Sequence, residues 1–414
     1  MPMLLGSKGK DILQWRASAE LVSALKGNFV RKWGHSSARE AESLLRQFIE
    51  SLDHELEYEK DLQREISALE EGFEEVASAA LVPPLLARQR EVASAHFRRR
   101  QSVLALCGIC SALHDRAVTR VVALAGERMQ QLGQGEAPLH ALIVCGDRGR
   151  GEQTLQSANR YLLLHEEEKS RAIMFSRQLS TALKETGLLA ADHLFWHGTL
   201  SSWRALLAGQ AVRDEDGGAS SPFLNAPRQI PEREWRLEAM TDLQQVAGDA
   251  GLGSAALDSA ARAVLEERNR SHFLQLARRV ITLPLALGRF GRWRLAKDGE
   301  HRGELDLQEL GIDPLVMTLR VLAVAGEITA AGTVGRIQAL LEKGFLTVEL
   351  SERLLKAYQC LMQARILSEI RSELPGAWVN TEELELEQDE RLRTSIDTVL
   401  NLQKIAYQRM VGMG

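Results

Sequence analysis

Hydrophobic residues recur at helical spacing over most of the 414-residue chain. Leu45, Ile49 and Leu52 are one example, and Leu69 and Phe73 continue the same spacing further on. Side chains three and four positions apart share one face of an α-helix. The pattern predicts helices over 15–33, 38–81, 85–132, 169–185, 199–207, 232–250, 254–287, 314–325, 334–343, 349–369 and 389–410.

Several residues are expected to begin or end these helices. Ser36 or Ser37 is a suitable N-cap, because a serine hydroxyl can accept a hydrogen bond from a free backbone N–H of the first turn. Pro83 and Pro84 are expected to interrupt the helical pattern, since proline has no N–H to donate. Thr333 is placed to cap the helix that follows it, and 288–300 is expected to be a connecting loop.

One segment has a different pattern. The apolar runs Leu139–Cys145 and Tyr161–His165 predict two strands, and His193–His197 predicts a third. Gly146 and Gly149 follow the first run and lead into a short polar stretch. A strand that opens into a glycine turn can gather backbone N–H groups around a phosphate, although plain turns have the same form.

The chain is too long for one compact core, and we expect three domains. These are an N-terminal helical domain (1–135), an α/β domain (136–230) and a C-terminal helical domain (231–414). Gly133, Gly135 and Pro138 mark the first boundary. The predicted fold class is therefore mostly α with a small α+β domain, in which a mixed sheet is flanked by helical domains.

Composition limits the classes of function. The net charge of −5 argues against broad nucleic-acid binding, and 5% aromatic residues give few stacking platforms. No stretch approaches the roughly 18 apolar residues of a membrane span. Four cysteines in a chain of this length do not form a disulfide framework. A reducing, cytoplasmic location is the simplest interpretation, and no membrane partner is expected.

Three smaller motifs receive structural interpretations. Cys107 and Cys110 have CxxC spacing, but their apolar flanks indicate buried thiols rather than a redox or zinc site. Arg98–Arg100 could contact phosphate, yet successive helical residues point in different directions. His193 and His197 could bind a metal only with supporting carboxylates, and none can be placed beside them.

The ten residues GDRGRGEQTL, which follow Cys145, are more specific than a glycine turn. They resemble a motif of the nucleotidyltransferase family related to the N-terminal domain of the protein-PII uridylyltransferases, within the DNA polymerase β-like superfamily. That motif reads roughly G-S-x-G-R-x-E-Q-T-L, then T-D-x-D. The resemblance continues through the C-terminal helices and covers most of the chain. The motif positions that agree are Gly146, Gly149, Arg150, Glu152, Gln153, Thr154 and Leu155.

The departures fall on the positions that carry the chemistry. In this superfamily the Gly-Ser pair holds the nucleotide phosphates, and the two aspartates bind two divalent metal ions. Here Asp147 stands at the serine position, and Ala158 and Arg160 stand at the aspartate positions. Alanine offers no ligand, and arginine brings a permanent positive charge to a cation site. Glu166–Glu168 lie a five-residue strand away, about 16 Å, which is too far to replace the pair.

The resemblance therefore implies a nucleotidyltransferase-like pseudoenzyme that has lost its two-metal reaction. It would act in signal transduction through binding, as a regulator or a subunit partner. We expect a protein partner, and we assign no metal and no cofactor. The matching Gly-Arg-x-Glu-Gln cluster would be structural or would retain a nucleotide site, with Arg160 meeting phosphate. The candidate nucleotide-binding residues are Gly146, Asp147, Gly149, Arg150, Glu152, Gln153 and Arg160.

Two other functions stay open. An active enzyme would transfer a uridylyl or adenylyl group to a protein or small molecule, using Mg²⁺ and a nucleoside triphosphate. It would need relocated carboxylates, for which Asp192 is an example. The third possibility is a helical interaction scaffold without a ligand. The sequence does not specify the substrate, the partner or the oligomeric state.

Overall fold

The computed structural model describes residues 38–157, 159–166, 169–190, 195–208 and 240–411. The chain divides into two compact units, Met1–Ala68 and Leu69–Gly414, and each is described by itself. The described part of the first unit is the beginning of helix α2 (Ala38–Glu75). The predicted helix over 15–33 and the predicted caps at Ser36 and Ser37 lie outside the described residues.

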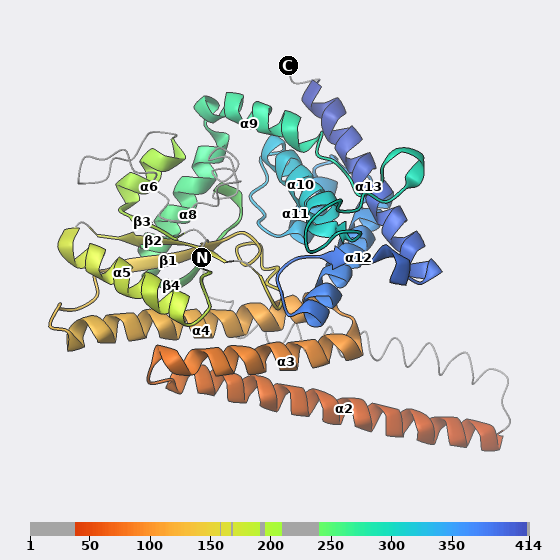
Figure 1. The fold of residues 1–414 in the computed structure, drawn as a ribbon, viewed down its shortest axis with the longest axis horizontal. Helices are drawn as coiled ribbons and strands as arrows, with labels where there is room; N and C mark the ends of the chain where they lie inside the picture. The colour runs from red at the N-terminus through yellow and green to blue at the C-terminus, as the bar shows by residue number, and fades with distance from the viewer. Residues whose placement is uncertain (1–37, 158, 167–168, 191–194, 209–239, 412–414) are drawn as a thin grey trace. The chain divides into compact units, whose positions relative to one another are not determined.

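The second unit consists mainly of helices, with a small sheet among them (Figure 1). This arrangement confirms the expected fold class. In chain order after α2, the elements are α3 (Val82–Arg100), α4 (Val103–Gln131), β1 (His140–Cys145), β2 (Arg160–His165), α5 (Lys169–Glu185), β3 (Phe195–Gly198), α6 (Leu200–Leu207), β4 (Leu243–Gly248), α8 (Ala250–Leu265), α9 (Glu267–Val280), β5 (Leu305–Asp306), α10 (Asp313–Ala325), α11 (Thr333–Glu342), α12 (Val348–Ser372), β6 (Trp378–Val379) and α13 (Leu386–Val411).

The four-stranded sheet has the order β3-β2-β1-β4. β1 is antiparallel to both of its neighbours, whereas β2 and β3 are parallel. Cys145 at the end of β1 lies opposite Arg160 of β2 on one side and Leu243 of β4 on the other. The loop that leaves β1 therefore emerges between the starts of β2 and β4.

Helices cover both faces of this sheet. Leu162, Leu164 and Trp196 pack in one cluster with α6 and α8. The side chain of Tyr161 is on the opposite face, where its hydroxyl lies 2.9 Å from Nε2 of His114 in α4. Burial on both faces explains why β1 and β2 are continuous apolar runs in the sequence rather than alternating patterns.

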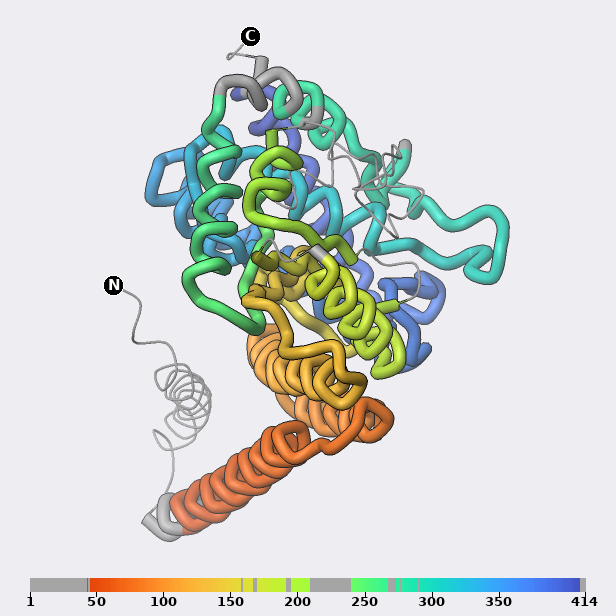
Figure 2. Tube along the Cα trace, turned by 90° about the vertical axis from the view of Figure 1, so that its left-hand side faces the viewer, coloured from red at the N-terminus to blue at the C-terminus, as the bar shows by residue number. Residues whose placement is uncertain are grey.

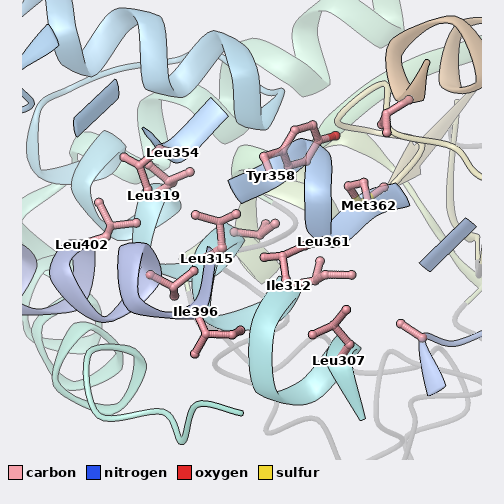
Figure 3. Packing of buried hydrophobic residues seen from close by; sticks show 14 of the residues in the cluster. Leu307, Ile312, Leu315, Leu319, Leu354, Tyr358, Leu361, Met362, Ile396 and Leu402 are labelled. Atoms are coloured by element: carbon pink, nitrogen blue, oxygen red, sulfur yellow. The ribbon is translucent and has the colours of Figure 1, made fainter. Parts of the chain in front are cut away.

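The largest hydrophobic cluster lies among the C-terminal helices (Figure 3). Leu315 of α10, Leu361 of α12 and Ile396 of α13 are each at most 1% exposed. Phe97 of α3 and Leu106 of α4 belong to the same cluster. The helices before and after the sheet are thus joined by one shared core.

Strand β4 was not predicted. The sequence pattern favoured a helix over 232–250, but Leu243–Gly248 forms an edge strand that pairs with β1. Its side chains are mostly half-buried or exposed, so it lacks the apolar run that identified β1 and β2. Pairing with an existing strand overrides local helix preference at such a position.

Two predicted long helices are each interrupted. The helix expected over 254–287 is divided at Glu266, whose backbone is extended. The helix expected over 85–132 is divided at Gln101, which is in the left-handed region with φ 54°. Ser102 then caps α4, because its hydroxyl accepts a hydrogen bond from the N–H of Ala105.

No helix within the described ranges is long and apolar enough to cross a membrane. The limits of the three domains stay a prediction, and the sheet takes one of its strands, β4, from beyond residue 231. The two cysteines of the CxxC motif, Cys107 and Cys110, are both buried free thiols in α4.

Replacing Leu361 by alanine tests the shared core. Leu361 is fully buried, so we expect the free energy of unfolding to fall by about 2–5 kcal/mol. Urea denaturation followed by circular dichroism measures this change. Leu386→Ala is the matched control, because Leu386 is 86% exposed and should change stability by less than about 0.5 kcal/mol. Equal effects of the two substitutions would contradict the assignment of the core.

Candidate functional site

Several backbone N–H groups of the loop after β1 donate hydrogen bonds to backbone oxygens of the same chain. The N–H of Gly146 donates to the backbone oxygen of Asp242 over 3.2 Å. The N–H of Arg150 donates to the oxygen of Gly146 over 2.9 Å, and that of Glu152 to the oxygen of Asp147 over 2.8 Å. These donors fold the loop into a compact turn. They are not available to cradle a phosphate in this conformation.

Gly149 is required by steric fit. A Cβ atom at this position would lie 1.9 Å from the backbone oxygen of Asp242 and 3.1 Å from the Cα of Cys145. Gly146 is required for a different reason, since its φ of 86° is rarely adopted by residues with a side chain. Close packing against the chain entering β4 therefore explains the glycine at 149, and backbone conformation explains the one at 146.

Arg150 connects three carboxylates at the centre of the site. Its Nε donates to Glu152 over 2.8 Å, one Nη to Asp242 over 2.9 Å and the other to Asp147 over 2.5 Å. The arginine side chain is only 7% exposed. All three branches of the guanidinium are thus occupied by groups of the same chain, in the geometry that gives strong charge-assisted hydrogen bonds.

Asp242 is fully buried and binds three arginines. Besides Arg150, its carboxylate accepts hydrogen bonds from Arg320 of α10 and Arg336 of α11. Burial by itself would raise the pKa of Asp242, but the charges of Arg320, Arg336 and Arg150 outweigh it and hold that pKa well below its usual range. Asp242 is therefore a permanent anion that joins the β1 loop to two C-terminal helices.

A second group of ion pairs joins the loop to α12. Arg365 donates to Asp147 over 2.7 Å and to Glu369 over 2.8 Å. Glu369 also accepts from the Thr154 hydroxyl over 2.9 Å. Burial would raise the pKa of Asp147, but Arg365 and Arg150 hold it well below its usual range. The carboxylate of Asp147 is thus an ion-pair partner inside the protein.

Glu152 caps a helix of the C-terminal region. Its Oε1 accepts a hydrogen bond of 2.6 Å from the backbone N–H of Thr333, the first residue of α11. The prediction that Thr333 caps this helix with its own side chain is wrong, because Gly332 holds the cap position and makes no side-chain bond. A carboxylate at a helix N-terminus also interacts favourably with the helix dipole.

A further set of polar side chains joins α4 to the loop after β1 and to the sheet. Arg148 pairs with Asp115 of α4 and donates to Gln244 of β4 over 2.7 Å. His114, beside Asp115, contacts the Tyr161 hydroxyl. Burial lowers the pKa of His114 despite the nearby carboxylate, so the imidazole is neutral at physiological pH. These contacts fix α4 against both the loop and the sheet.

The structure places the other predicted residues as follows. Gln153 is buried, and within the described residues its amide oxygen has no hydrogen-bond partner. Arg160 begins β2 and is half-buried opposite Cys145. Ala158, Asp192 and His193 lie outside the described residues.

The remaining candidate groups that the structure describes lie elsewhere in the fold. Glu166 is exposed beyond the end of β2. His197 of β3 contacts His165 of β2, with Nδ1 of the first 3.5 Å from Nε2 of the second. Arg98–Arg100 form the last turn of α3.

The cluster pairs four arginines with four carboxylates. Each arginine contacts at least one carboxylate of the chain. Across the part of the chain that the structure describes, no group of three or more His, Cys, Asp or Glu could hold a metal ion. The paired residues are Arg150, Arg320, Arg336 and Arg365 with Asp147, Glu152, Asp242 and Glu369.

Sequence reasoning missed the residues that complete the cluster. Asp242 falls in a stretch that was expected to be helical, and Arg365 and Glu369 lie on a helix whose pattern indicated only a core face. The one usable signal was the presence of arginine and glutamate among apolar residues of α12, where charged groups require partners.

Comparison with known families gives two matches. Residues 87–216 match the family model described as "Putative nucleotidyltransferase DUF294", and residues 270–410 match the one described as "Putative nucleotidyltransferase substrate binding domain". The first match contains β1–β3 and the loop after β1. The second contains Arg320, Arg336 and Arg365. Asp242 lies between them. No curated protein matches the chain.

Replacing Gly149 by alanine tests the steric requirement. The added Cβ would collide with backbone that the surrounding ion pairs hold in place, so we expect a loss of about 1–3 kcal/mol or more in unfolding free energy. Gly335→Ala is the control, because the nearest atom is 3.7 Å away and alanine favours the interior of α11. It should stabilise slightly. Chemical denaturation of both variants checks the opposite signs.

Asp313 gives a pH-dependent prediction. Burial raises its pKa to about 6, helped by nearby Asp147 and opposed by the 2.6 Å hydrogen bond from Gln308. A carboxyl group whose pKa is raised on folding stabilises the fold while protonated, and that stability is lost as the pH rises through 6. Asp313→Asn keeps an acceptor for Gln308 and cannot ionise. We expect it to be more stable than wild type by roughly 1–3 kcal/mol at pH 8.

The advantage of Asp313→Asn should disappear near pH 4. Unfolding free energies measured at several pH values between 4 and 8 would reveal the crossover. A difference that stays constant over this range would show that ionisation of Asp313 does not limit stability.

Proposed function

We propose that this chain, which carries a segment of the "Putative nucleotidyltransferase DUF294" type followed by its substrate-binding domain, acts by binding rather than by nucleotidyl transfer. We further infer that it is related to the N-terminal domain of the protein-PII uridylyltransferases. The observation that carries the proposal is the residue set at the catalytic positions, Asp147, Ala158 and Arg160. None of the three can serve as the family's phosphate-binding serine or metal-binding aspartates.

The geometry around Asp147 supports this proposal. A serine hydroxyl at that position could donate to a phosphate, whereas Asp147 can only accept and is ion-paired to Arg150 and Arg365. Arg150 and Arg365 are therefore neutralised by carboxylates of the chain itself. A nucleoside triphosphate would have to displace these buried ion pairs, and breaking them would leave uncompensated charges.

The same contacts suggest how binding could have an effect elsewhere. The loop after β1 and the substrate-binding domain are held together by charge-assisted hydrogen bonds, including the cap that Glu152 provides to α11. A ligand or protein that binds to the loop or to the substrate-binding domain would therefore affect the hydrogen bonds that join the two. We therefore assign the chain a regulatory or subunit-partner role in signal transduction.

Nucleotide titration tests the loss of transfer. UTP and ATP would be titrated calorimetrically with and without Mg²⁺, and pyrophosphate release would be measured in parallel. We expect no Mg²⁺-dependent binding and no pyrophosphate, because the metal ligands are missing. Mg²⁺-dependent binding accompanied by pyrophosphate release would contradict the proposal and establish an active enzyme. In that event Asp192→Asn would identify one relocated carboxylate.

Arg160→Ala separates the two non-enzymatic alternatives. If Arg160 meets phosphate in place of a metal, wild type should bind a nucleotide equally with and without Mg²⁺, and the substitution should weaken that binding at least tenfold. Arg302→Ala is the control, since Arg302 is an exposed arginine of another segment. Absence of any nucleotide binding by wild type would indicate a helical interaction scaffold.

A further inference from the structure

The segment between α9 and α10 carries an exposed aromatic residue. Phe290 is 97% exposed, more than any other large hydrophobic residue described. It is at the tip of a tight turn, between Gly288 and Gly291. Figure 2 shows part of this segment, coloured teal, as a loop that extends from the neighbouring helices.

The backbone of Phe290 makes this placement unusual. Its φ of 61° and ψ of 24° lie in the left-handed region, and Gly291 follows with φ 69°. Turn positions of this kind normally hold glycine, asparagine or aspartate, because a side chain with a Cβ is disfavoured there. An exposed phenyl group adds a further cost in water. Neither the turn nor the core requires phenylalanine at this position.

Hydrogen bonds and ring contacts hold the base of the turn in place. The N–H of Gly288 donates to the oxygen of Arg292 over 2.8 Å, and Leu287 forms an antiparallel bridge with Trp293. The indole Nε1 of Trp293 donates to Asp389 of α13 over 2.8 Å. The guanidinium of Arg393 lies 4.5 Å from the centre of the Trp293 ring. The phenyl group is therefore presented on an ordered base, which lowers the entropic cost of docking.

The charged residues of the tip itself are all arginines, and the carboxylate of Asp389 beside Trp293 is paired with Arg393. The sequence from 286 to 295 contains three arginines and no carboxylate. Arg292 and Arg294 are exposed, and neither has a carboxylate partner among the described residues. A rigid apolar anchor beside outward-facing arginines is the composition of an interface hot spot.

We propose that this tip, Leu287–Trp293 with Arg294, docks into an apolar pocket rimmed by carboxylates on a partner protein. A protein fits better than a nucleic acid, because a single phenyl group is not a stacking platform and the chain has a net charge of −5. The inference rests on the binding role proposed above. It does not depend on the loss of catalysis.

Photo-crosslinking tests the proposal on the full chain. p-Benzoylphenylalanine replaces Phe290 in the cells that produce the protein, and the crosslinked peptide is sequenced by mass spectrometry. We expect one partner protein, crosslinked within a surface that combines apolar residues with aspartate or glutamate. The same amino acid at Leu386 is the control, because that residue is 86% exposed but lies between Glu385 and Glu387. It should not reach this surface.

Competition identifies the groups responsible. Excess wild-type protein should suppress the crosslink, whereas Phe290→Gly and the double variant Arg292→Glu, Arg294→Glu should compete at least tenfold less well. Phe290→Gly should keep or raise the melting temperature, because glycine adopts the left-handed turn readily. Its weaker competition could not then be attributed to unfolding.

Several results would overturn the proposal. These are the absence of a crosslink, a crosslink to nucleic acid or to a second copy of the chain, and equal competition by Phe290→Gly. Because the crosslink does not report on nucleotide turnover, its failure is distinguishable from pyrophosphate release, which would overturn the proposed function instead.

Discussion

The buried carboxylate of Asp242 is the interaction on which the arrangement of this protein depends. It binds Arg150 from the loop after β1, Arg320 from α10 and Arg336 from α11, so three separate elements converge on one anion. Loss of one partner from such a group typically costs about 3–5 kcal/mol, because the remaining charges stay buried without compensation. The relative positions of the loop and the helices that follow are therefore specified by electrostatics as well as by apolar packing.

The position of Asp242 gives a structural explanation for the glycine and arginine residues of the loop after β1. Position 149 requires glycine because the backbone of Asp242 leaves no room for a Cβ atom. The positive charge of Arg150 compensates the three carboxylates around it. Each feature would also suit a phosphate-binding loop. In this protein both are explained by contacts within the chain.

The arginines of the buried cluster and those of the Phe290 turn differ in their partners. Within the cluster, every arginine contacts a carboxylate, as burial requires. At the Phe290 turn, Arg292 and Arg294 face solvent beside an exposed phenyl group. Internal pairing stabilises one arrangement of the chain. Unpaired charge on an ordered turn remains available to another molecule.

Much of the secondary structure could be predicted because its signal is local. Helical periodicity identified the long helices, and the apolar runs before and after the glycine loop identified β1 and β2, since both faces of those strands are covered. Strand β4 could not be found in this way. Its residues are polar or half-buried, and only pairing with β1 makes them a strand.

By itself, the sequence determined the fold class and the place of the motif, because each of these is a property of neighbouring residues. The tertiary structure alone decided the partners of the motif. Glu152 caps α11 across 181 positions, and Asp147 pairs with Arg365 across 218. The sequence neighbours of a charged residue do not indicate which distant residue will be its partner. Only folding brings the two within the few ångströms over which a hydrogen-bonded ion pair forms.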